Sequence, residues 1–128
     1  MIDTWVVVAD GSHAHFYSTD AEMLEFESAR EEKNKNHSGS HRGRQDEGAA
    51  HHSEEAAFAK DLANIVAHAV NAHEVQDVVL VAPAKFLSEL HGALPASVAK
   101  HVKAKLNKDF TKLERHELAK RVKSALAE

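Results

Sequence analysis

The sequence predicts an α/β fold in which helices pack on a mixed β-sheet of about five strands. Two nearly continuous apolar runs, WVVVA at residues 5–9 and VQDVVLVA at residues 75–82, have the pattern of strands that are covered on both faces. Apolar residues at helical spacing lie between these runs. The length of 128 residues suits one domain, so we expect a single domain over residues 1–128.

Three strands are expected at the start of the chain. Asp10 and Gly11 close the first apolar run, as residues of a turn do. Alternation of small or apolar with polar residues predicts a second strand over residues 13–19 and a third over residues 23–29. Consecutive strands of this kind form a meander, and we expect the strands of the two apolar runs at the centre of the sheet.

A long polar segment follows, from about residue 33 to residue 52. It holds no aliphatic residue larger than alanine and therefore has no face to bury in a core. Loops of this length in compact domains are usually functional segments or linkers. We therefore expect a mobile loop here, and we expect function to reside in it.

Helical and strand patterns alternate after the loop. Ser53, followed by Glu54 and Glu55, is typical of a helix start and predicts a long amphipathic helix over residues 54–72. The elements expected after it are a strand over residues 75–82, short helices over residues 85–91 and 96–100, a half-exposed strand through Val102, Ala104 and Leu106, and a helix marked by Leu113, Leu118, Val122, Ala125 and Leu126. The predicted order is therefore βββ, loop, α, β, α, α, β, α.

Composition excludes several kinds of site and partner. The chain has no cysteine, which removes disulfides and thiolate sites. Its start lacks a basic segment followed by an apolar run, and none of its apolar stretches has the length of a membrane span. We expect a cytoplasmic protein with no membrane partner.

The net charge of −4 conceals a basic C-terminal part of the chain. Residues 99–128 hold nine Lys or Arg residues against four Asp or Glu residues. Such a surface attracts phosphate, and its candidate contacts are Lys103, Lys105 and Lys108. The alternative is that these lysines form the ordinary solvated faces of a strand and a helix.

Histidines suggest two further sites. Four histidines of the loop provide imidazoles of the kind that zinc or nickel binds: His37, His41, His51 and His52. No predicted element anchors them, so a solvated loop is the simpler interpretation, and we expect neither a metal nor another cofactor. Asp10, Ser12 and His13 have the composition of a catalytic triad, but neighbours in sequence do not have the geometry that a triad requires.

Four strings together resemble the bacterial host attachment protein family: WVVVADGSHAHFY, FAKDLANIVAHAV, VVLVAPAKFLSELHGAL and VKAKLNKDFTKLERHEL. The resemblance extends over nearly the whole chain. That family is similar in turn to the middle domain of archaeal and eukaryotic class 1 release factors, and Ala82, Phe86 and Leu90 match its Ala-x-x-x-Phe-x-x-x-Leu order. The resemblance therefore implies the fold of a release-factor middle domain.

The loop departs from the release factors at the residues that matter for their chemistry. In release factors the equivalent loop carries Gly-Gly-Gln and reaches the peptidyl transferase centre. Here Arg42, Gly43, Arg44 and Gln45 keep one glycine and the glutamine but lack the glycine pair. The basic residues of the loop suit contacts with RNA phosphate, so we expect these four residues to form a contact site without catalytic residues.

The resemblance leaves several functions open. We prefer a non-catalytic module that binds ribosomes or RNA, rather than DNA, in stress or translation regulation. The alternative, implied by the family name, is an interaction protein that affects surface attachment indirectly. A metal-dependent enzyme that uses the loop histidines comes third, and the oligomeric state stays open.

Overall fold

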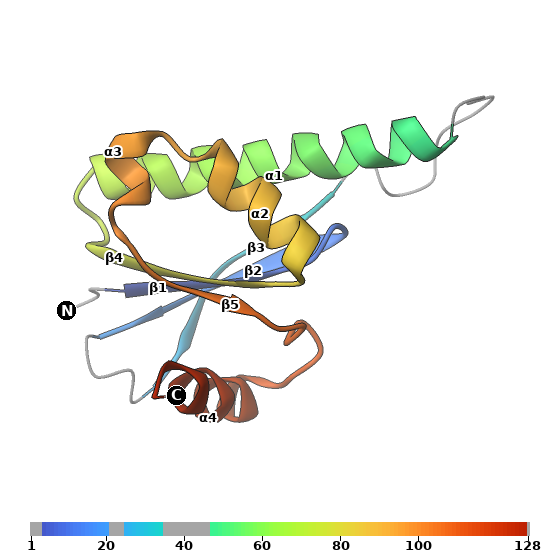
Figure 1. Cartoon of the computed structure of the whole chain (residues 1–128). Helices are drawn as coiled ribbons and strands as arrows, with labels where there is room; N and C mark the ends of the chain where they lie inside the picture. Colours follow the sequence, from blue (N-terminus) through green and yellow to red (C-terminus); the bar gives the residue numbers. More distant parts are fainter. Residues whose placement is uncertain (1–3, 21–24, 35–46, 128) are drawn as a thin grey trace.

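The computed structural model describes residues 4–20, 25–34 and 47–127, and of residues 47–54 it describes the backbone alone. Its strands are β1 (Thr4–Ala9), β2 (His13–Thr19), β3 (Glu27–Lys33), β4 (Asp77–Ala82) and β5 (Val102–Asn107). Its helices are α1 (Glu47–Asn71), α2 (Ala84–Ala93), α3 (Ala96–Ala99) and α4 (Arg115–Leu126). The order of the elements is the predicted one (Figure 1).

The five strands form one mixed sheet in the order β3–β2–β1–β4–β5. The pairs β1–β2 and β2–β3 are antiparallel and form the predicted meander, whereas β1, β4 and β5 run parallel. The two apolar runs become the central strand β1 and its neighbour β4, as predicted. The predicted fold class is therefore confirmed.

Helices cover both faces of the sheet (Figure 1). α1, α2 and α3 cover one face, where Phe58 and Leu62 pack with Val7, Phe16 and Leu80 of the strands. α4 covers the other face in a smaller cluster: Val6, Val8, Tyr17, Phe26, Val79, Val81, Leu118 and Val122. The alternation of side chains along β1 therefore supplies both clusters.

α1 is longer than the strands of the sheet on which it packs. Its 25 residues give a length of about 37 Å, whereas a strand of six residues spans about 20 Å. Buried side chains of α1 run from Phe58 to Val70, so its first turns extend past the sheet (Figure 1). The predicted start at Glu54 was wrong, because the apolar repeat marks only the part of the helix that touches the sheet.

The third strand also differs from its prediction. β3 spans Glu27–Lys33 rather than residues 23–29, and no side chain of β3 is buried. Phe26, just before it, is the apolar residue that packs under α4. Backbone pairing with β2, including a register shift between Phe16 and Tyr17, defines this strand. The other predicted elements are confirmed with ends that shift by at most two residues.

Candidate functional site

The turn between β1 and β2 is organised by the Asp10 carboxylate. Its Oδ1 accepts hydrogen bonds from the backbone N–H groups of Ser12 at 2.8 Å and His13 at 2.9 Å. Burial alone raises the pKa of Asp10, but these two N–H groups and the His13 imidazole outweigh burial and hold the pKa below its ordinary value. Asp10 therefore acts as a turn-forming residue.

Asp10, Ser12 and His13 do not form a catalytic triad at this turn, as the sequence analysis expected. The Asp10 carboxylate accepts from backbone groups, and the His13 Nδ1 lies 3.4 Å from Oδ1. Within the described parts of the chain, no hydrogen bond links the Ser12 hydroxyl to an imidazole. A serine nucleophile requires such a contact to lose its proton, so the geometry does not favour nucleophilic catalysis by Ser12.

Both described flanks of segment 35–46 meet this turn. Asn34, which follows β3 and is 4% exposed, donates from its backbone N–H to the Ser12 carbonyl at 2.8 Å and from Nδ2 to the Gly11 carbonyl at 2.9 Å. On the other flank, Glu55 of α1 covers Gly11 so closely that an added Cβ would lie 2.6 Å from its carboxyl group. We call Asp10, Gly11, Ser12, Asn34 and Glu55 the loop base.

The loop base lies at the edge of the sheet where the parallel strands end. β1, β4 and β5 all point toward this carboxyl edge. The Lys108 N–H donates to the Ala82 carbonyl at 3.2 Å, and the Thr111 hydroxyl lies 3.5 Å from the second oxygen of Asp10. Ligands of open α/β sheets usually bind outside the carboxyl ends of the strands, so this edge is the candidate site.

A groove between α2 and β5 has a volume of about 380 Å³. The alternation along β5 directs Lys105 and Asn107 into it, while Ala104 and Leu106 pack against the α4 cluster. Ser88 and His91 line it from α2. These side chains can bind phosphate oxygens and the edges of bases, because they provide an ammonium, an amide, a hydroxyl and an imidazole group.

A polar row on β2 joins the meander strands. His15 lies 2.7 Å from the Ser28 hydroxyl through Nε2 and 3.2 Å from the Tyr17 hydroxyl through Nδ1, and its ring stacks on that of Tyr17. Burial raises the pKa of Tyr17, and the nearby Glu31 carboxylate raises it further, against a smaller effect of Arg115. This row ties β2 to β3 beside the register shift.

The predicted site residues fall into two groups. Arg42, Gly43, Arg44, Gln45, His37 and His41 lie outside the described residues, as do the side chains of His51 and His52. The backbone of the last two belongs to α1, so their predicted place in the loop was wrong. All three predicted lysines, Lys103, Lys105 and Lys108, are exposed.

The structure separates these lysines along one strand. Lys105 enters the α2–β5 groove and Lys108 lies at the carboxyl edge, whereas Lys103 stands beside a register shift of β5. The sequence analysis missed Ser88, His91 and Asn107. The three-residue spacing of Ser88 and His91 on an expected helix was the signal that they share a face.

Clusters of metal-ligating side chains and membrane-spanning helices are both absent from the residues that the structure describes. Among these residues, no three His, Asp or Glu side chains are placed to hold a metal ion. No helix in the same part of the chain combines the length and the apolar character that crossing a membrane requires.

Two archaeal structures of low sequence identity share this fold. The crystal structure of the archaeal translation termination factor aRF1 matches with a TM-score of 0.53 and 10% identity, over 97% of this chain and 39% of that one. A structure described as an archaeal protein matches with a TM-score of 0.55 and 10% identity, over 97% and 38%. Saccharomyces cerevisiae Dom34, a translation termination-like factor, matches with a TM-score of 0.47 and 12% identity, over 86% and 30%.

The chain spans about two fifths of the length of the two archaeal proteins. No curated protein sequence matches it significantly. These matches agree with the release-factor part of the sequence resemblance, while the host attachment name has no support among them. A family model matches residues 3–122, nearly the whole chain, and the chain belongs to the family it describes, bacterial archaeo-eukaryotic release factor family 12.

Proposed function

We propose that this chain is a non-catalytic module that binds the ribosome or its RNA and acts in stress or translation regulation. The observation that carries the proposal is the convergence at one edge of the sheet. The loop base, Lys108 and the projecting start of α1 all lie at the carboxyl edge. Membership of a release-factor family and a fold shared with aRF1 support the ribosome as the partner.

The loop would act from a rigid base. Segment 35–46 follows Asn34 of the loop base in the sequence and precedes α1, which begins at Glu47. Arg42 and Arg44 lie in this segment. A loop held at both ends loses less conformational entropy on binding than a free tail, which favours contact of its guanidinium groups with RNA phosphate.

The α2–β5 groove adds a second polar surface, near the carboxyl end of β5. Lys105 supplies a cation, and Ser88, His91 and Asn107 supply polar groups that can address a base or a sugar hydroxyl. The module is proposed to be non-catalytic, because its loop lacks the glycine pair of the release factors. Arg42 and Arg44 flank a single glycine, Gly43. We expect no release of peptide from ribosomes loaded with peptidyl-tRNA.

Co-sedimentation with ribosomes over a range of salt concentrations tests the proposal. The wild-type protein should bind at low salt and dissociate as salt rises, because phosphate contacts release counterions. Arg42→Ala with Arg44→Ala, and separately Lys105→Ala with Lys108→Ala, should each weaken binding roughly tenfold and flatten the salt dependence by about one unit per lost phosphate contact.

Lys100→Ala is the matched control for the lysine pair. Lys100 is exposed and stands just before β5, at the opposite end of that strand from Lys108. It should bind like the wild type. A protein that stays unbound at low salt, or paired variants that bind like Lys100→Ala, would contradict the proposal.

The attachment-related role and the metal-dependent enzyme stay predictions that the sequence alone suggested. No described side chain favours either of them over ribosome binding.

A further inference from the structure

A second groove lies at the opposite end of the sheet from the loop base. Glu27, the first residue of β3, pairs with Ser18, while the neighbouring Thr19 pairs with Thr4 at the start of β1. The groove therefore lies at the amino ends of the parallel strands, on the face that α4 covers. Its volume is about 370 Å³. We call it the charged groove.

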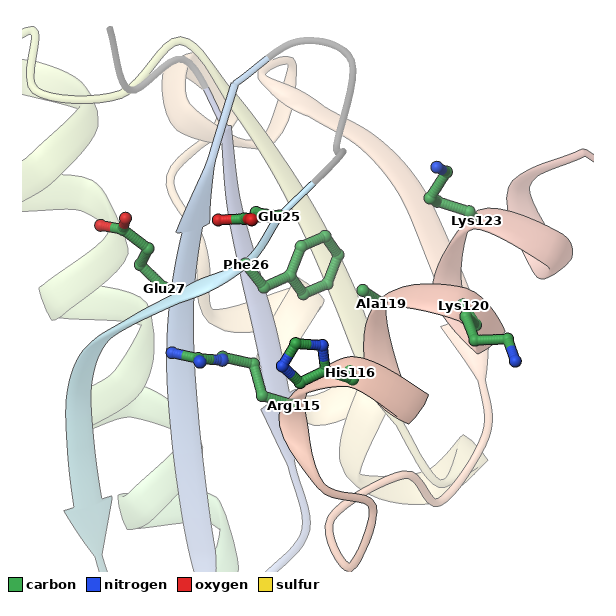
Figure 2. A pocket seen from close by; sticks show the side chains of 8 residues that line it. All are labelled: Glu25, Phe26, Glu27, Arg115, His116, Ala119, Lys120 and Lys123. Atoms are coloured by element: carbon green, nitrogen blue, oxygen red, sulfur yellow. The ribbon is translucent and has the colours of Figure 1, made fainter.

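The two walls of the charged groove carry opposite charges (Figure 2). Glu25 and Glu27 form one wall, at the start of β3. α4 forms the other wall with Arg115 and His116 from its first turn and with two lysines further along, Lys120 and Lys123. All of these charged side chains are exposed, and Figure 2 shows the Lys120 ammonium pointing away from the opposite wall.

The opposite charges on the two walls of the charged groove are not joined by ion pairs among the described residues. Arg30 pairs with Glu32, and Arg121 pairs with Glu117. Carboxylates and cations that face a shared space without contact favour a ligand that carries both charges. A simple anion would bind the α4 wall but would be repelled by Glu25 and Glu27.

The floor of the groove is apolar. Phe26 is 2% exposed and packs with Leu118 under α4, and Figure 2 shows its ring between the two walls. Ala119 adds a methyl group to the lining. Phe26 closes the groove from below but is too buried to offer much contact surface, so the charges of the two walls decide which ligand fits.

We propose that the charged groove binds short peptides with free ends, with the ammonium end against Glu25 and Glu27 and the carboxylate end against Arg115. Its volume equals that of a cube about 7 Å on a side. Two extended residues span about 7 Å, so a dipeptide is the expected size. The planar guanidinium of Arg115 suits a two-point hydrogen bond with a terminal carboxylate.

Titration of the full chain with the dipeptide Ala-Leu tests this inference, with backbone amide chemical shifts as the readout. The unmodified dipeptide should shift the amides of residues 25–27 and 115–123 in a saturable manner. N-acetyl-Ala-Leu and Ala-Leu-amide, which each lack one terminal charge, should bind about fivefold or more weakly. These measurements involve no ribosome, so their outcome is independent of the proposed function.

Two variants assign the two ends of the peptide. Arg115→Gln should weaken Ala-Leu about fivefold and remove the difference between Ala-Leu and its amide. Glu25→Gln with Glu27→Gln should remove the difference between Ala-Leu and its acetylated form. Arg121→Gln is the control, since Arg121 lies on the same helix but pairs with Glu117 and does not line the groove.

Three results would overturn the inference. The first is no saturable shift with Ala-Leu. The second is equal binding of Ala-Leu and its blocked forms, which would make the ends irrelevant. The third is inorganic phosphate producing the same shifts at the same concentration, which would make this a simple anion site.

Discussion

The core under α1 and the loop base are held together by different forces. Under α1, Phe58, Leu62 and Val66 are at most 3% exposed and pack on the strands through apolar contacts. At the loop base, Asp10 and Asn34 fix the backbone through hydrogen bonds to N–H and carbonyl groups. Apolar burial decides whether the chain folds, whereas these few polar contacts decide where segment 35–46 leaves the sheet.

The largest effect should come from the core. Leu62→Ala removes a side chain that is 0% exposed in the middle of α1, and we expect the free energy of unfolding to fall by about 3 kcal/mol through lost burial and a residual cavity. Denaturant titration measures it. Lys60→Ala, an exposed position on the same helix, should change stability by less than about 0.5 kcal/mol. Similar values for both variants would contradict the assignment of this region as the main core.

A smaller effect with a local signature should come from Asn34. Asn34→Ala leaves the Gly11 carbonyl without its side-chain donor, and we expect a loss of about 1–2 kcal/mol. Hydrogen exchange at the Ser12 and His13 amides should accelerate more than exchange in the middle of α1. Asn71→Ala, at the exposed end of α1, is the control. Equal acceleration in both regions would mean that the loop base has no separate stability.

The same contrast explains how far the sequence predicted the fold. β5 was located correctly, because Val102, Ala104 and Leu106 alternate with exposed residues. β3 was placed four residues early, since a strand with no buried side chain has no apolar period to read. The start of α1 was predicted seven residues late, because residues 47–57 hold no apolar residue larger than alanine. A hydrophobic pattern therefore predicts only those parts of a strand or helix that contact the core.

The candidate site was only partly predictable. Lys105 and Lys108 followed from the charge of the C-terminal part, but Ser88 and Asn107 carry no charge signal. Asn34 belongs to the loop base through contacts with a distant turn, since the Gly11 carbonyl that it binds lies 23 residues earlier in the chain. The α2–β5 groove and the loop base both form where segments distant in the sequence meet. In the sequence, their residues look like ordinary polar residues.

The smallest expected effect on stability comes from the charge of Asp10, and its dependence on pH distinguishes it from the other effects. Its pKa is lowered below the ordinary 3.8 in the folded protein, so its charge stabilises the fold above pH 3.8 and that contribution is lost as pH falls below this value. Asp10→Asn keeps an oxygen acceptor for the Ser12 and His13 amides but removes the charge. It should therefore be less stable than the wild type at pH 7, and this difference should narrow as pH falls below 3.8.

Asp10→Ala separates the hydrogen bonds from the charge. It removes the acceptor itself, so we expect a loss of about 1 kcal/mol at pH 7, larger than that of Asp10→Asn, and part of this loss should persist at low pH. Denaturant titrations of the three proteins at pH 7 and pH 3 measure both terms. If the Asn and Ala variants were equally stable at both pH values, the two backbone hydrogen bonds would contribute nothing, and the loop base would be held by Asn34 and Glu55 alone.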